Sequence, residues 1–213
     1  MLRLPFFKVS DRTIYSLSEE ERLKTLIIDQ VYMKPSQRKR EIMGYTLDRE
    51  YNDQILVVYK SDVENVVIVG IRGTASLTDI ISDIQLVVQQ ITSLSVMDNS
   101  ERFKKLHKMV LDIYMKYSNY GYTVKLTGHS LSGFEIMRLE NLEPDKVTQS
   151  TAFNAGAPPI TFYKIPKDVK HIGNPFDPIS LPFKNDPQTR LYYKRGVTAF
   201  NPLANHSIKY FID

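Results

Sequence analysis

The sequence predicts an α/β layered domain, and three observations lead to that prediction. Runs rich in β-branched residues alternate with runs of helical periodicity along the chain, which is typical of helices layered on a sheet. The 213 residues suit one domain, although two small domains would also fit that length. Hydrophobic residues make up 42% of the chain, enough for one sizeable core. No linker, repeat or low-complexity tract divides the chain, so we expect a single domain over residues 1–213.

Helical periodicity marks four segments. The first predicted helix spans about 18–34, because Ser18 and Glu21 form a capping box and Pro35 stops the helix. Apolar residues at helical spacing follow its start. The same periodicity predicts helices over 76–88, over 100–118 with Asn99 or Ser100 as the cap, and over 131–141.

Strands are predicted where short β-branched runs lie between polar turns. These runs are 55–59, 66–71, 124–127, 147–153, 169–172 and 192–194. The segment after the last strand is rich in proline and reads as a loop until Asn205.

Charge and composition exclude several classes of protein. The net charge is +4, but the basic residues are scattered apart from Arg38-Lys39-Arg40, which we expect to lie in a solvated loop. A surface that binds the phosphate backbone of a nucleic acid usually needs more than one short basic run, so we expect no nucleic-acid partner. Cysteine is absent, which excludes disulfides and thiolate metal sites and fits a reducing compartment. The four histidines, at 107, 129, 171 and 206, lack the paired spacing of a catalytic zinc site, so no metal is expected.

No membrane span or secretion signal is evident. No apolar run approaches the roughly 18 residues that a spanning helix needs. The apolar patch at 2–7 is short and interrupted, unlike the core of a signal peptide. We therefore expect a soluble, intracellular protein.

The segment Lys125–Phe134, KLTGHSLSGF, has the form of a nucleophile elbow. A strand, a sharp turn at Gly128-His-Ser130 and a helix would lift the serine hydroxyl out of the sheet and leave helix N–H groups beside it. The usual motif is G-x-S-x-G, and Ser132 stands at its second glycine, with Gly133 following directly. The plainer alternative is that Ser130 only caps the following helix.

A hydrolase of this type also needs a hydrogen-bond donor on a loop after an earlier strand. The predicted strand 66–71 runs into Arg72-Gly73-Thr74. Thr74 is the candidate donor to an oxyanion. The alternative is that Gly73 and Thr74 form only the turn before the next helix.

Only two histidines follow the candidate nucleophile in sequence. His171 lies in a β-prone run, so we expect it to be structural. His206 lies in the tail, where a loop can deliver a general base. This order, serine then acid then histidine, is that of the α/β-hydrolase triad.

Three aspartates compete for the role of the acid. Asp177 lies just past a predicted strand end, in a loop that Pro178 makes rigid. Asp168 and Asp186 are the alternatives. Asp177 is preferred because it follows the strand end closely and precedes His206 by a loop-rich segment.

Taken together, these motifs resemble the class 3 lipases, the family that includes the fungal triacylglycerol lipases. The resemblance covers about residues 55–211 and keeps the family's order. The matching segments are Val69-Gly-Ile-Arg-Gly-Thr74, Asp79-Ile-Ile-Ser-Asp83, Lys125 to Gly133, Phe153-Asn-Ala-Gly-Ala-Pro158, Asp177-Pro-Ile-Ser-Leu-Pro182 and His206-Ser-Ile-Lys-Tyr210. Any one of these segments is weak evidence for the family, but several of them in the family's order are strong evidence together.

The resemblance implies an α/β-hydrolase fold, with a mostly parallel central sheet flanked by helices, and ester hydrolysis without a cofactor. It implies Ser130 as the nucleophile, Asp177 as the orienting acid and His206 as the general base. It implies Thr74 and Leu131 as the oxyanion donors. The substrate would be an acylglycerol, a phospholipid (as in a phospholipase A1) or a small ester, with possible peripheral contact with a lipid surface.

The sequence departs from the family pattern in three places. Ser132 replaces a glycine, at a modest expected steric cost, so Ser132→Gly should leave activity similar or higher. The helix from Phe134 carries bulky residues where small ones are usual, and the lid region 75–78 lacks tryptophan. The first two departures motivate an alternative function, a lipase-like binding or scaffolding protein that has lost its chemistry.

Overall fold

A computed structural model describes residues 12–73, 94–146, 148–156, 164–194 and 202–212. Its strands form one continuous sheet in the order β1-β9-β8-β7-β6-β5-β4-β3-β2. The pairings from β1 across to β5 are parallel, and those from β5 to β2 are antiparallel. The strands are β1 (Thr13–Ile14), β2 (Glu41–Ile42), β3 (Tyr45–Asn52), β4 (Leu56–Ser61), β5 (Val66–Ile71), β6 (Thr123–His129), β7 (Ser150–Phe153), β8 (Val169–Gly173) and β9 (Thr189–Tyr192).

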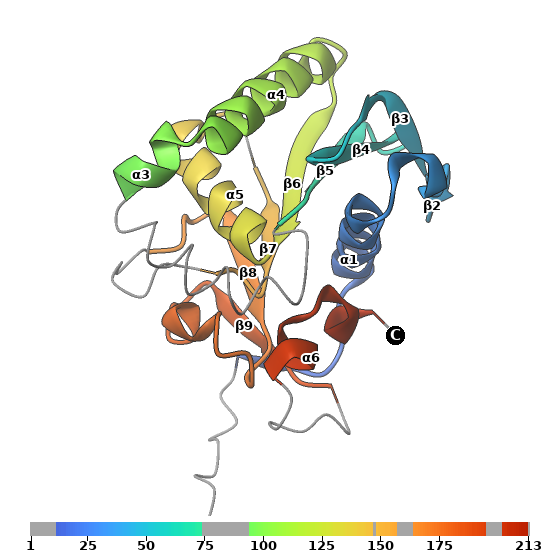
Figure 1. The fold of residues 1–213 in the computed structure, drawn as a ribbon. Helices are drawn as coiled ribbons and strands as arrows, with labels where there is room; N and C mark the ends of the chain where they lie inside the picture. Colours follow the sequence, from blue (N-terminus) through green and yellow to red (C-terminus); the bar gives the residue numbers. More distant parts are fainter. Residues whose placement is uncertain (1–11, 74–93, 147, 157–163, 195–201, 213) are drawn as a thin grey trace, which may run out of the picture.

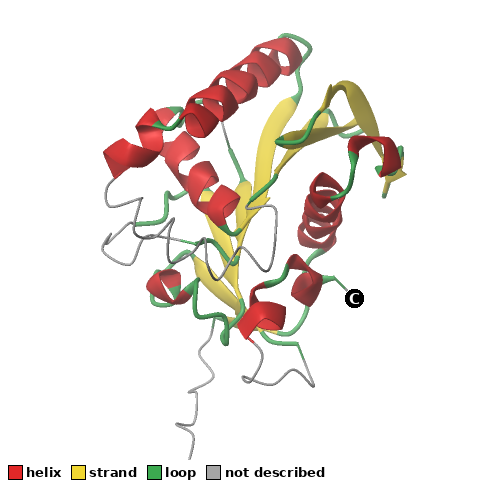
Figure 2. Ribbon diagram, in the orientation of Figure 1, coloured by secondary structure: helices red, strands yellow, loops and turns green. Residues whose placement is uncertain are grey.

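Helices cover both faces of this sheet (Figure 1). The α-helices are α1 (Glu19–Tyr32), α3 (Leu94–Asn99), α4 (Glu101–Ser118), α5 (Leu131–Leu142) and α6 (Pro202–His206). Short 3-10 helices lie at η1 (Pro35–Gln37), η2 (Leu181–Phe183) and η3 (Ile208–Phe211). In Figure 2, α3, α4 and α5 lie on one side of the sheet, while α1 and the C-terminal α6 and η3 lie on the other.

The core therefore has two layers. The buried stripe of α4 packs with α5 on one face of the central strands, and it comprises the predicted residues Phe103, Leu106, Val110, Ile113 and Tyr117. On the other face, Leu23, Ile27 and Val31 of α1 pack against β4 and β5. The Ser18 capping box is present as predicted, with the Glu21 N–H donating to Ser18 Oγ at 3.3 Å.

Several predicted boundaries needed correction. Strand β7 begins at Ser150 rather than 147, and β9 ends at Tyr192 where the predicted strand 192–194 begins. In the tail, which was expected to be a loop until Asn205, residues 202–206 form α6, and His206 is its last residue. The predicted helix 76–88, the lid region 75–78 and Thr74 lie outside the described residues. Strands β1, β2 and β3 and helix α3 were not predicted. Strands β1 and β2 have only two residues each, and β3 (YTLDREYN) is largely polar.

The basic cluster at 38–40 is also different from the prediction. Arg38 is 6% exposed, so it does not lie in a solvated loop, whereas its neighbours Lys39 and Arg40 are exposed. Its guanidinium donates to the carbonyls of Gln30 at 2.9 Å and Val31 at 3.2 Å. Arg38 therefore supplies the positive charge that the last turn of α1 lacks.

Within the described segments, α4 is the longest helix, and none has the length and apolar character required to cross a bilayer.

Candidate active site

The nucleophile elbow joins β6 to α5. Ser130, between them, has φ 62° and ψ −127°, a strained conformation for a residue with a side chain. Its side chain makes no capping bond to α5, which contradicts the alternative that Ser130 is only a helix cap. The turn is also tightly packed, since a Cβ added to Gly128 would lie 2.7 Å from Ser132 Oγ. A Cβ on Gly73 would lie 2.5 Å from the His129 carbonyl oxygen.

The side chains of Ser130, His206 and Asp177 meet in the structure. His206 Nε2 lies 2.8 Å from Ser130 Oγ, and His206 Nδ1 lies 3.0 Å from Asp177 Oδ2. Asp177 lies in a turn after β8. Its N–H closes the turn by donating to the Asn174 carbonyl oxygen at 3.1 Å. His206 is the last residue of α6 rather than part of a loop. All three side chains are buried.

The competing residues lie elsewhere. Asp186 accepts the backbone N–H of Gln188 at 2.8 Å within its own loop. Asp168 is 42% exposed at its side chain. His171 is fully buried and pairs through Nδ1 with Thr189 Oγ1 at 3.0 Å, so it is structural as expected.

A second histidine holds the backbone of His206. Burial, together with the nearby His206, lowers the pKa of His129 to about 3, so its ring is neutral and carries one N–H. Its Nε2 contacts the His206 carbonyl oxygen, which can only accept, so the N–H is on Nε2. Its Nδ1 then accepts from the Tyr32 hydroxyl at 3.3 Å. Burial raises the pKa of Tyr32 to about 12, which keeps that proton in place.

Two buried amides hold the same segment of chain. Asn154 Nδ2 donates to the carbonyls of Asn205 at 2.9 Å and His206 at 3.2 Å, and Asn174 Nδ2 donates to Asn205 at 2.8 Å. The Asn174 N–H in turn donates to Asn154 Oδ1 at 2.7 Å. Asn154 has φ 42°, which asparagine tolerates better than most residues. Sequence reasoning missed both amides; the only signal for Asn154 was an asparagine just after a predicted strand.

Of the two expected oxyanion donors, the structure describes one. Leu131 begins α5, and the first N–H groups of a helix have no partner within that helix. Its N–H therefore belongs to the positive end of the helix dipole, directly after the candidate nucleophile. Thr74, the other expected donor, follows the last described residue of that segment, Gly73.

No arrangement for a metal is seen in the residues that the structure covers. They contain no group of three or more histidine, cysteine, aspartate or glutamate side chains that could hold an ion.

Solved structures with the same architecture exist. The structure is similar to Lip2 lipase from Yarrowia lipolytica, with a TM-score of 0.55, 15% sequence identity, and coverage of 93% of this chain and 95% of that one. The chain has an α/β-hydrolase fold. The fold implied by the family resemblance is thereby confirmed.

Two further structures are more distant. A triacylglycerol lipase from Penicillium expansum aligns with a TM-score of 0.48 and 16% identity over 81% of this chain and 76% of that one. A Rhizomucor miehei lipase propeptide complex aligns with a TM-score of 0.46 and 14% identity over 80% of this chain and 65% of that one. No protein-family model matches the sequence. Comparison with curated proteins gives no match either.

Proposed function

We propose that the chain is a serine carboxyl-ester hydrolase that acts on lipid esters. The observation that supports this proposal most directly is the position of His206, whose two ring nitrogens lie 2.8 Å from Ser130 Oγ and 3.0 Å from Asp177 Oδ2. A serine needs such a base because its hydroxyl is a weak nucleophile at neutral pH. The strained backbone of Ser130 presents that hydroxyl at a helix N-terminus.

The proposed reaction has two halves. His206 Nε2 takes the Ser130 proton as Oγ attacks the ester carbonyl, and Asp177 accepts the Nδ1–H and stabilises the imidazolium. The N–H groups of Thr74 and Leu131 would stabilise the oxyanion. His206 then protonates the leaving alcohol, and an acyl-enzyme remains on Ser130. Water, deprotonated by His206, attacks the acyl carbon and regenerates the serine.

The substrate class belongs to the same proposal. Lip2 of Yarrowia lipolytica is a lipase, and the family resemblance points to acylglycerols or phospholipids, including phospholipase A1-like cleavage. Hydrolysis at a lipid surface would require peripheral contact with that surface. The two departures that motivated a binding or scaffolding role are accommodated: Ser132 is hydrogen-bonded and Phe134 is fully buried in the core. That alternative is therefore not favoured.

Turnover of p-nitrophenyl esters of increasing acyl length tests the proposal. We expect wild-type hydrolysis to exceed that of Ser130→Ala by at least about 10³-fold, because the remaining groups cannot form the acyl-enzyme. Ser150→Ala is the matched control, since it removes a buried hydroxyl that accepts the Leu126 N–H on β6, four residues before Ser130, and makes no contact with the triad side chains. If the wild type never exceeds Ser130→Ala at any acyl length, the hydrolase proposal is wrong.

A fluorophosphonate probe gives an independent measurement. It labels only an activated serine, so we expect labelling of the wild type and of Ser150→Ala but not of Ser130→Ala. A folded wild type that does not react with the probe would instead support a binding role.

A further inference from the structure

The side chain of Ser132 makes specific contacts in the elbow. It is fully buried, and its Oγ accepts the His129 N–H at 2.9 Å. The same oxygen lies 2.8 Å from the Ile71 carbonyl and 2.9 Å from the His129 carbonyl, so its single proton is shared between these acceptors. The expectation that Ser132 is only a small steric perturbation is therefore wrong. Its hydroxyl joins the elbow to the last residue of β5.

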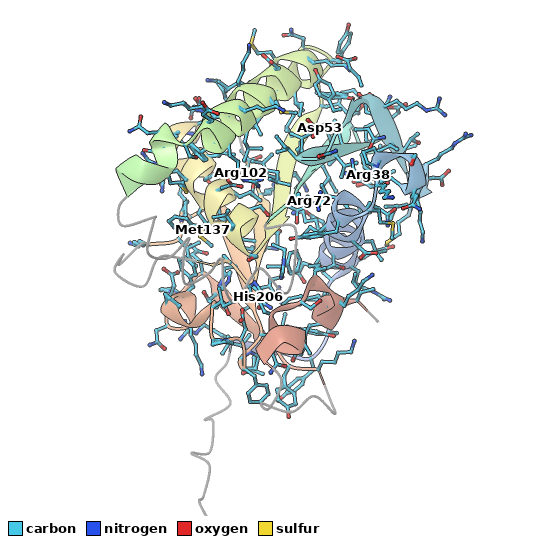
Figure 3. All side chains as sticks on the ribbon, in the orientation of Figure 1. Arg38, Asp53, Arg72, Arg102, Met137 and His206 are labelled. Atoms are coloured by element: carbon cyan, nitrogen blue, oxygen red, sulfur yellow. The ribbon has the colours of Figure 1, made fainter. Side chains whose placement is uncertain are left out.

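A second connection starts one turn along the same helix. Glu135 of α5 is 2% exposed and forms a two-pronged ion pair with Arg102 of α4, at 2.8 Å to Nε and 3.0 Å to Nη2. Arg102 Nη2 also donates to the carbonyl oxygen of Arg72. Figure 3 labels both residues: Arg102 lies beside α4 and α5, whereas the Arg72 side chain lies toward α1, with its guanidinium 5.8 Å from the Tyr32 ring centroid. Glu135 thus reaches the residue after β5 through Arg102.

The two connections end on consecutive carbonyl groups, those of Ile71 and Arg72. The next residue, Gly73, is packed so closely against the elbow that a Cβ would lie 3.4 Å from Ser130 Cβ as well as 2.5 Å from the His129 carbonyl. Three successive residues are therefore held against the nucleophile turn. The residue after them in sequence is Thr74.

We propose that Ser132 and the Arg102–Glu135 pair are positioning residues that hold the Ile71–Gly73 backbone against the nucleophile elbow. In doing so they fix the end of β5 relative to Leu131, the expected oxyanion donor that the structure describes. This inference rests on the proposed function for its catalytic consequence, but the positioning itself can be measured without activity. Misplacing a reacting group by about 1 Å costs on the order of a hundredfold in rate, so such positioning matters to a hydrolase.

Two substitutions test this arrangement with little change in shape. Ser132→Ala removes the hydroxyl and keeps Cβ, while Glu135→Gln keeps the side-chain outline and removes its charge. Each has a matched control. Ser150→Ala removes a buried hydroxyl that bonds to backbone elsewhere. Asp98→Asn weakens the two-pronged pair of Arg138, also on α5, whose bonds to Asp98 of 2.8 and 2.6 Å do not involve β5.

Amide hydrogen exchange at Arg72 and Gly73 is the first measurement. In the wild type the Arg72 N–H donates to the Ile55 carbonyl at 2.8 Å. We expect exchange at these two amides to speed up about tenfold or more in Ser132→Ala and Glu135→Gln, and to stay at the wild-type rate in both controls. Exchange that is unchanged in the two test variants overturns the inference, whether or not the protein hydrolyses esters.

Ester kinetics and inhibition by an alkyl boronic acid, which forms a tetrahedral adduct with the serine, give the second measurement. We expect kcat and boronic acid affinity to fall together by about tenfold to a hundredfold in the test variants, with KM within about twofold. A purely structural loss would leave the kcat of the folded fraction and the boronic acid affinity unchanged, and that result overturns the positioning role. If instead the wild type hydrolyses esters no faster than Ser130→Ala, only the proposed function is refuted. Ser132→Gly is now expected to behave like Ser132→Ala rather than to keep full activity.

Discussion

His206 is held at its backbone as well as at its ring. Its carbonyl oxygen receives hydrogen bonds from His129 and Asn154, while its ring lies between Ser130 and Asp177. Because both its backbone and its ring are held, the His206 side chain has little freedom to rotate. A general base needs this restriction in order to stay within hydrogen-bond reach of the nucleophile. The backbone contacts come from β6 and from the residue after β7, so strands of the sheet position the base.

Asn154→Gly tests the backbone contacts. Glycine adopts φ 42° without strain, so the substitution removes the amide but leaves the turn possible. We expect a loss of about 1–3 kcal/mol in the free energy of unfolding, because the buried carbonyls of Asn205 and His206 lose a donor. We also expect about tenfold slower ester turnover. Urea denaturation and p-nitrophenyl ester kinetics measure the two effects.

Gln149→Gly is the control for this substitution. Gln149 also has a positive φ, of 52°, but its side chain is exposed. Replacing it should change stability by less than about 0.5 kcal/mol and leave turnover unchanged. If Asn154→Gly behaves in the same way, the amide does not position His206.

The residues that could be predicted are those with a local motif or a fixed order along the chain. Ser130 has a strand, a turn and a helix around it, and Asp177 and His206 follow in the order that the fold requires. The structure brings the three together, and their chemical roles stay predictions. Asn154 and Asn174 carry no such motif, because their partners at 205 and 206 come from a segment that is distant in sequence.

At the scale of elements, the end of α1 depends on a residue outside the helix. Besides the two helix carbonyls, Arg38 (labelled in Figure 3) donates through Nη1 to Asn52 Oδ1 at 2.7 Å, which links α1 to the end of β3. One guanidinium therefore joins a helix C-terminus to β3. Its neighbours in sequence remain exposed, so a run of three basic residues could not reveal which one is buried.

Arg38→Met should destabilise the fold. Methionine keeps much of the aliphatic length but leaves the Gln30 and Val31 carbonyls without their charged donor. We expect a loss of about 2–3 kcal/mol in the free energy of unfolding, measured by urea denaturation. Arg40→Met, at an exposed position, should cost less than about 0.5 kcal/mol. Equal effects of the two substitutions would contradict the capping role.

Elements with a clear hydrophobic pattern were predicted, and the missed elements are either too exposed or too short to show one. Strands β4 and β5 are almost wholly buried, so their β-branched runs are unmistakable. Strand β3 lies near the sheet edge and buries little, so its sequence resembles a loop. Helix α6 has five residues and one turn, too few to show a period.

At the scale of the whole molecule, buried histidines make the fold sensitive to acid. Burial lowers the pKa of both His129 and His171 to about 3. In the unfolded chain a histidine takes up its proton near pH 6.5, so between about pH 6.5 and 3 the unfolded state binds more protons. Stability is therefore fully present above pH 6.5 and is lost as the pH falls, by up to about 1.4 kcal/mol per pH unit for each histidine.

His171→Gln isolates the contribution of one of them. The substitution should lower stability at pH 7, because glutamine cannot reproduce both the bond from the Ala155 N–H and the bond to Thr189. Between pH 6 and 4, however, the variant should lose stability more slowly than the wild type, by about 1 kcal/mol per pH unit. Urea denaturation at several pH values measures both slopes. Parallel slopes would mean that His171 is not held neutral in the folded state.

Strand β1 has a consequence for how the chain is made. Its two residues pair in parallel with Leu191 and Tyr192 of β9, near the other end of the chain. Helix α1 likewise packs against η3, so part of its apolar face is covered by a late segment. At a synthesis rate of about 5–20 residues per second, a nascent chain would wait on the order of ten seconds or more for these partners. During that time part of the apolar face of α1 has no partner, and the core around it can form only after the Ile208–Phe211 segment has been synthesised.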